Sequence, residues 1–343
     1  MSAASTVPTD LFIPEACKEY FGYEFYTSLG VLNNLVGTDG NKPINVVNLG
    51  LLQNGGQFIQ APIFQPITNL VTRTDETSFA AVDTSKITGR NDRGVRLAFK
   101  MGPTAYSQNA EWVSKAKPGQ LSMEFGRQAA RMTKEYIQNA IVYATKAVIA
   151  GMTGSAHTLS VWNATSRTNL STALLAQGRA KMGDRTGVIN SWLMRSESEY
   201  DLLAFQLGSG VAGIADKATD TGSVATLGAV REVLDHPTLT VTDAGFDKYY
   251  TIGMGGGFCE LEFIQGPVFQ PVQWLNNADM VQFILRGDMA FSLRFPGIQW
   301  DVTDGGANPD PATTLATAGN WTPVYADARE VKAVMIEHNI SSN

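Results

Sequence analysis

The chain has 343 residues, of which 17% are charged and 44% are hydrophobic. This length allows two compact domains or one domain with large extensions, and 16 Phe, 10 Tyr and 6 Trp residues argue against intrinsic disorder. The net charge of −6 gives no overall attraction for nucleic acid, and two cysteines exclude a disulfide framework or a zinc site. The sequence shows neither a signal peptide nor the roughly 18 consecutive apolar residues of a membrane span. We expect a globular protein of the cytosol whose sparsely charged surface is partly covered by partners.

The first segments of the chain predict little compact structure. Residues 1–43 are expected to form an extended arm with one or two helical turns between Pro14 and Leu35, where aromatic residues recur at helical spacing. Residues 44–67 contain two short apolar runs separated by Asn54–Gly56, a pattern that predicts strands. This segment is a piece of a sheet rather than a domain.

Residues 68–110 alternate between polar and apolar side chains and contain few large aliphatic residues. The pattern predicts a β-hairpin with its tip at Asn91–Gly94. A two-stranded ribbon of this length is marginally stable in water on its own. We therefore expect another surface to pack against it.

The clearest predicted element is a helix over residues 120–150, which has no internal proline. At about 1.5 Å per residue it would be roughly 45 Å long, about the width of a whole domain. Its spacing predicts one continuous apolar face made of Leu121, Phe125, Ala129, Met132, Tyr136, Ala140, Tyr143 and Ala147.

A second face of this helix carries a basic stripe formed by Arg127, Arg131 and Lys134. Residues 71–150 hold 12 basic and 7 acidic residues, a net charge of +5, which leaves −11 for the rest of the chain. Two interpretations remain open. The stripe is either a solvated face with weak ion pairs or a patch that faces an acidic partner or a polyanion.

Residues 152–284 alternate short apolar runs with helical patterns and predict a mixed α/β domain, including a helix that starts at Ser196 with Glu199 in the capping-box position. The closing residues 285–343 contain a turn at Gly305–Pro309 and a final strand, VKAVMIEHN.

No pattern of catalytic residues accompanies these elements. The three histidines, His157, His236 and His338, are far apart in the sequence and belong to no metal-binding or nucleophile motif. The glycine run Gly253–Gly257 lacks the Lys and Ser/Thr of a phosphate-binding loop and is followed by strand-forming residues. We therefore expect no catalytic, cofactor or metal site.

Several segments resemble one known family when they are taken in order. They are the hairpin pattern of residues 68–110, the long helix, the strand and helix of Asn190–Leu203, the strand pattern of Val230–Gly257, and the tail with Trp300, Ala307–Pro309, Leu315 and Trp321. Together they resemble the major capsid protein of tailed bacteriophages, the Hong Kong 97-type fold.

The resemblance implies an α+β capsid fold with an N-terminal arm, an extended β-hairpin called the E-loop, a peripheral domain with a long spine helix, and an axial α/β domain. The implied segments are the arm (1–43), peripheral strands (44–67), the E-loop (68–110), the spine helix (111–151), the axial domain (152–284), and C-terminal strands that return to the peripheral or axial sheet (285–343).

The resemblance also implies a structural protein that is not an enzyme and needs no cofactor. It would self-assemble as hexamers and pentamers into an icosahedral shell in the cytoplasm of a host bacterium, without a membrane, and become part of the virion. Double-stranded DNA would line the inner surface without sequence specificity, and portal, decoration and scaffold proteins are possible partners. Because the arm starts close to Met1, we expect a separate scaffold protein or none.

Two sets of basic residues are the candidate contacts. We expect hairpin cations to pair with acidic residues of a neighbouring subunit: Arg73, Lys86, Arg90, Arg93 and Arg96. We expect Arg127, Arg131 and Lys134 to face the lumen or a neighbour's arm or hairpin. The alternatives are an encapsulin-like nanocompartment shell and, from a different class, an oligomeric α/β enzyme.

Overall fold

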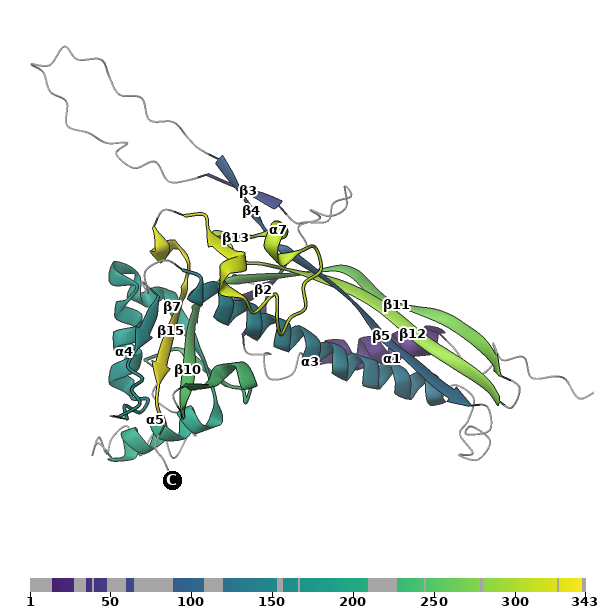
Figure 1. Cartoon of the computed structure of the whole chain (residues 1–343), viewed down its shortest axis with the longest axis horizontal. Helices are drawn as coiled ribbons and strands as arrows, with labels where there is room; N and C mark the ends of the chain where they lie inside the picture. The colour runs from purple at the N-terminus through teal and green to yellow at the C-terminus, as the bar shows by residue number, and fades with distance from the viewer. Residues whose placement is uncertain are drawn as a thin grey trace, which may run out of the picture.

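The molecule is elongated, with a compact unit at one end and a long sheet and helix that extend from it (Figure 1). The structure is a computed structural model. The structure describes residues 14–27, 35–38, 40–47, 60–64, 89–107, 120–152, 157–165, 167–208, 227–243, 245–277, 280–325 and 327–340.

A five-stranded sheet, here called the long sheet, runs along the extended part in the order β1-β2-β11-β12-β5. β11 and β12 form an antiparallel hairpin, β5 pairs antiparallel with β12, and β2 pairs parallel with β11. The strands are β1 (Val36–Gly37), β2 (Ile44–Val46), β5 (Val95–Ser107), β11 (Cys259–Asn277) and β12 (Met280–Arg294).

Helix α3 (Gln120–Ala150) lies along the long sheet and has the bounds that the sequence predicts. Aromatic side chains join the two, with the Tyr136 ring centroid 4.8 Å from that of Phe99 on β5 and 6.2 Å from that of Phe291 on β12. The expected apolar face is only partly buried, since Met132 is 72% exposed. A broader set of α3 residues is buried because the helix has a second neighbour.

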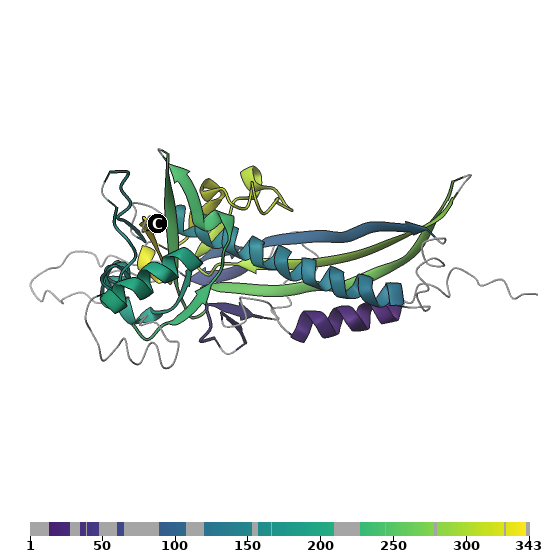
Figure 2. The ribbon, with the colours of Figure 1, turned by 90° about the horizontal axis from the view of Figure 1, so that it is seen from below.

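That neighbour is α1 (Pro14–Thr27), which lies beside α3 in both views (Figures 1 and 2). α1 is a full helix of 14 residues, longer than the one or two turns expected for an extended arm. Its Cys17, Phe21 and Phe25 are almost completely buried, and a Cβ on Gly126 of α3 would lie 2.4 Å from the Cys17 carbonyl oxygen. This part of the arm therefore belongs to the core of its own chain, because its apolar face and the glycine of α3 allow close packing.

The compact unit contains a second sheet, the compact sheet, in the order β6-β15-β10-β7-β8, with β9 also paired to β10. Trp192, Ile336 and Leu175 are buried at the centre of its core. Its elements are β6 (Thr158–Ser160), α4 (Thr172–Ala180), η4 (Gly183–Val188), β7 (Ile189–Met194), α5 (Ser196–Gly208), β8 (Val230–Val233), η5 (Pro237–Leu239), β9 (Thr240–Asp243), β10 (Phe246–Gly255) and β15 (Ala333–His338).

The C-terminal part packs against α3 and β4 before it returns as β15. Trp300 and Trp321 are buried with their ring centroids 4.7 Å apart, and their strands pair with each other. The elements are β13 (Ile298–Trp300), α7 (Val302–Gly305), η6 (Ala318–Asn320), β14 (Trp321–Pro323) and η7 (Ala328–Glu330). The final strand is therefore part of the compact sheet.

The hairpin differs from the expected one. β4 (Gly89–Arg93) pairs with β3 (Gln60–Phe64), whereas β5 pairs with β12. Asn91–Gly94 is therefore not a hairpin tip, because it leads directly from one sheet into the next. The expected boundary between residues 284 and 285 lies inside β12, since the chain leaves the compact sheet near Cys259 and forms the β11–β12 hairpin of the long sheet.

Candidate functional site

Three charged side chains meet where the β3–β4 hairpin joins the body of the chain, a place we call the hairpin root. The Arg294 guanidinium at the end of β12 lies 3.0 Å and 3.2 Å from the two carboxylate oxygens of Asp92 on β4. Its Nε donates to Glu260 on β11 at 2.6 Å. Asp92 is completely buried and Arg294 is 12% exposed, so this ion pair is largely shielded from water.

Two glycines allow the backbone to pack closely at the hairpin root. A Cβ on Gly94 would lie 2.8 Å from the carbonyl oxygen of Leu293, so β4 and β5 can pass close to the end of β12 only without a side chain at this position. Gly297 has a φ of +86°, and a Cβ there would lie 2.1 Å from the Tyr325 ring. Burial raises the pKa of Tyr325, and the nearby Asp92 carboxylate raises it further.

The predicted hairpin cations fall in different places. Arg73 and Lys86 lie outside the described residues, and Arg90 lies in β4 with its side chain outside the described part. Arg93 is half-buried in β4. Arg96 lies in β5 opposite Ser292 and so belongs to the long sheet instead of the hairpin, because β5 pairs with β12.

The basic stripe of α3 is partly neutralised within its own chain. Arg131 Nε lies 3.1 Å from Glu24 Oε1 of α1, and Arg127 lies 3.7 Å from Glu124, one turn earlier in α3. Burial lowers the pKa of Lys134, and the Glu24 carboxylate opposes this shift. Through Arg131, the stripe therefore contacts α1 of its own chain, and the side chains of Arg127 and Arg131 are still exposed to solvent.

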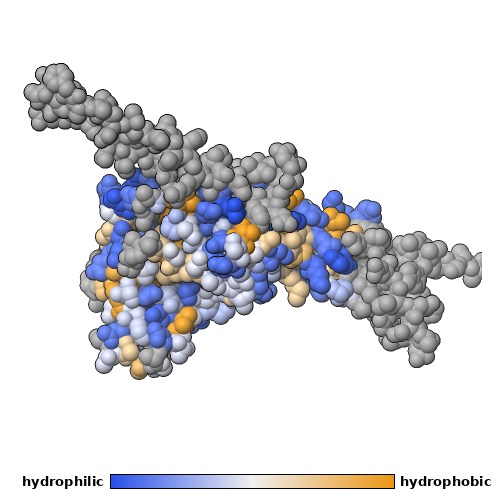
Figure 3. Space-filling view, turned by 45° about the horizontal axis from the view of Figure 1, so that its top comes forward, coloured by the Kyte–Doolittle hydropathy of each residue, from blue (hydrophilic) through white to orange (hydrophobic). Residues whose placement is uncertain are grey.

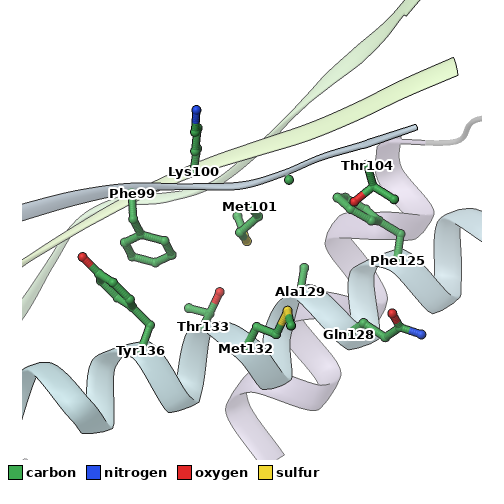
Figure 4. Close-up of a pocket in the computed structure, with 11 residues that line it drawn as sticks. Phe99, Lys100, Met101, Thr104, Phe125, Gln128, Ala129, Met132, Thr133 and Tyr136 are labelled. Carbon is green, nitrogen blue, oxygen red and sulfur yellow. The ribbon is translucent and has the colours of Figure 1, made fainter. Parts of the chain in front are cut away.

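An apolar groove of about 270 Å³ lies between β5 and α3 (Figure 4). Phe99 and Met101 point from β5 toward the helix, and Phe125, Met132 and Tyr136 line the other side. Its other lining residues are Lys100, Gly102, Thr104, Gln128, Ala129 and Thr133. The lining offers apolar contact and contains no histidine, cysteine or carboxylate that could serve as a nucleophile or base.

The open edge of β5 is partly occupied by a side chain. Asn308 accepts a hydrogen bond from the Ala98 amide at 2.8 Å and donates to the Ala98 carbonyl at 3.0 Å, as a neighbouring strand would. β5 ends the described order of the long sheet, and such edges readily pair with other strands. The sequence predicts only a turn around Asn308.

The joint between α3 and the compact sheet contains a half-buried lysine. Lys146 Nζ donates to the Thr238 carbonyl at 2.7 Å and lies 3.7 Å from the centroid of the Tyr250 ring. Burial lowers the pKa of Lys146 to about 8 and raises that of Tyr250 to about 12. These contacts connect the helix to β10 and to the turn before β9.

The three histidines lie apart in the structure. His338 is buried beside Thr251, His157 is buried near the start of β6, and His236 packs edge-on against Tyr143. Among the described residues, no group of three or more His, Cys, Asp or Glu side chains could hold a metal ion. Both cysteines are free and buried, and burial raises the pKa of Cys17 to about 12.

Exposed apolar side chains are scattered over the surface. On the face shown in Figure 3, hydrophobic residues form separate spots between hydrophilic ones. The large exposed hydrophobic residues include Tyr23 on α1, Met132 on α3, Tyr200 on α5 and Val268 on β11. Within the described part of the chain, no helix combines the length and the apolar character that a membrane span requires.

Several solved structures of phage capsids and heads are similar in fold to this chain. The capsid of the cyanophage Pam1 matches with a TM-score of 0.61 at 10% identity, covering 100% of this chain and 98% of that one. The head of Helicobacter pylori bacteriophage KHP40 matches with a TM-score of 0.54 at 9% identity and 90% coverage of both chains. The capsid of Ralstonia phage GP4 matches with a TM-score of 0.53 at 10% identity, covering 100% and 94%. No curated protein sequence matches the chain.

These matches confirm the α+β, Hong Kong 97-like capsid fold that the sequence resembled. A family model described as Gp13-like, major capsid protein 13-like, matches residues 44–335. That range includes α3, the hairpin root and all described strands of both sheets, except β1 and the last three residues of β15. The chain therefore belongs to the Gp13-like family of phage major capsid proteins and is a structural protein of the virion rather than an enzyme.

Proposed function

We propose that the chain assembles as hexamers and pentamers into a closed icosahedral shell around double-stranded DNA. The observation that carries the proposal is the β3–β4 hairpin, whose two strands pair with each other and, among the described residues, with no further strand. A two-stranded ribbon is marginal in water by itself. Among the described residues β4 contacts β13 at the base of the hairpin, and a neighbouring subunit would supply further packing.

The domain roles follow the same proposal. The long sheet with α1 and α3 would act as the peripheral domain, and the compact sheet with α4 and α5 as the axial domain. The β3–β4 hairpin would act as the E-loop, with Arg73, Lys86 and Arg90 as candidates for pairing with acidic residues of the neighbour. Arg93 and Arg96 are weaker candidates, because both are half-buried within their own chain.

Assembly can be tested with the purified chain, both alone and with an added scaffold protein. Sedimentation velocity and negative-stain electron microscopy should show closed particles of uniform diameter, with or without an added scaffold protein. A small discrete oligomer under both conditions would contradict the proposal. We also propose portal, scaffold and decoration proteins as partners, and the bacterial cytoplasm as the place where the shell forms.

The basic stripe is the candidate contact with packaged DNA or with a neighbour's arm. Arg131 already pairs with Glu24, so changing it would also disturb the docking of α1. The cleaner variant is Arg127→Gln with Lys134→Gln, which keeps that ion pair. Because phosphate contacts by cations depend on salt, the variant should lose DNA from filled particles at a lower salt concentration than the wild type. If the variant assembles normally and retains DNA as well as the wild type does, the stripe has no role in binding DNA or a neighbour's arm.

A further inference from the structure

The chain passes from the hairpin to the long sheet at a single residue, Gly94. β4 ends at Arg93 and pairs with β3, and β5 begins at Val95, opposite Leu293 of β12. Because a Cβ on Gly94 would lie 2.8 Å from the Leu293 carbonyl oxygen, the backbone at the transition is in close contact with the end of β12. The contact of Gly94 with the end of β12 therefore helps to fix the direction in which the hairpin leaves the body of the chain.

Arg294, the residue after Leu293, also fixes the position of the chain where β4 passes into β5. It binds Asp92, two residues before Gly94, and Glu260, its partner in the β11–β12 register. A guanidinium is planar and presents its donors in fixed directions, so it constrains two carboxylates relative to each other. β4 is therefore oriented against both long strands by one side chain.

We propose that Arg294 is a positioning residue that sets the direction in which the β3–β4 hairpin leaves the body, and so determines where the hairpin meets the neighbouring subunit. This inference rests on the proposed function of the hairpin. Without the arginine, Asp92 and Glu260 would be two like charges near each other in a largely buried place. Their repulsion and their need for water would move β4 away from β11.

The test compares Arg294→Gln with Arg286→Gln. Both arginines lie in β12 and pair with an aspartate, but Arg286 is 49% exposed and binds Asp288 within the same strand at 2.8 Å. Hydrogen exchange by mass spectrometry reports separately on β4 and on α3. Electron microscopy of the same preparations reports the diameter and yield of the shells.

We expect Arg294→Gln to raise exchange in β4 at least about tenfold while α3 keeps its wild-type protection. Shells of this variant should be fewer or irregular, and Arg286→Gln should match the wild type in both measurements. Wild-type exchange in β4 together with shells of wild-type diameter and yield would overturn the proposal.

Two further outcomes are informative. If Arg294→Gln unfolds the whole chain, α3 loses its protection as well as β4. Asp92→Asn is then tested in place of Arg294→Gln, because it keeps the ion pair of Arg294 with Glu260. Unchanged exchange in β4 of Asp92→Asn would overturn the proposal. If the wild-type chain forms no shells, the proposed function fails, whereas the exchange of β4 still decides the role of Arg294.

Discussion

Replacing Phe21 with alanine tests whether helix α1 belongs to the core of its own subunit. Phe21 is 1% exposed, its ring is stacked 5.3 Å from that of Phe25, and it meets the ring of Phe269 edge-on at 5.8 Å. Truncating a fully buried Phe to Ala costs about 3–5 kcal/mol, since the cavity adds to the lost apolar burial. We expect the free energy of unfolding to fall by about 4 kcal/mol, a change of roughly 1,000-fold in the unfolding equilibrium.

Tyr23→Ala is the matched control, because Tyr23 lies on the same helix and is 73% exposed. Urea denaturation of unassembled subunits, followed by tryptophan fluorescence, measures both variants against the wild type. The control should change stability by no more than about 0.5 kcal/mol. If Phe21→Ala destabilises no more than the control, α1 does not dock on its own chain and the account of the arm is wrong.

Three further predictions concern single residues. Burial lowers the pKa of His338 from 6.5 to about 4, so between these pH values the unfolded chain binds more protons than the folded chain. The free energy of unfolding should therefore fall by about 3 kcal/mol as the pH drops through this range. His338→Gln should flatten that part of the stability curve measured by urea denaturation. Gly297→Ala should lower the Tm more than Gly306→Ala, because both positions have positive φ but only the first would clash with Tyr325; equal shifts would contradict this. Asn308→Ala should lower the free energy of unfolding by about 1–2 kcal/mol, because two hydrogen bonds to Ala98 are lost. It should also increase light scattering on storage, since it uncovers the edge of β5. Unchanged scattering would show that another part of the chain protects this edge.

Helix α3 is the most predictable element of the fold. Residues 120–150 contain no proline and repeat apolar residues at helical spacing over eight turns or so, which is a purely local signal. The buried faces were less predictable. Met132 continues the apolar spacing but is exposed, whereas Ala130 and Ile137 are buried, because burial depends on where α1 and the sheet lie. One sequence does not contain that information in a local pattern.

The predicted position of the hairpin tip is wrong, because the composition of a turn does not reveal which strands pair. Asn91–Gly94 has the composition of a tight turn, yet Gly94 is used for close backbone contact with Leu293. The true partner of β4 is β3, about 30 residues earlier, and the short apolar run in Gln60–Phe64 could equally have joined another sheet. Strand pairing over such separations depends on tertiary contacts that propensity does not encode.

The hairpin root was also missed. Asp92 and Arg294 are 202 positions apart, and no spacing in the sequence links either of them to Glu260. The Glu260 side chain is largely buried, at 17% exposure, and Glu262 in the same strand is 6% exposed. A carboxylate between apolar residues in the strand Cys259–Glu262 was the one available signal for a buried ionic partner.

Electron cryo-microscopy of particles assembled from the purified chain tests the central claim most directly. The account predicts a closed shell in which every β3–β4 hairpin lies against a neighbouring subunit and Arg294 bridges Asp92 and Glu260 in each copy. Particles in which the hairpin contacts only its own chain, or a small oligomer with no shell, would contradict it.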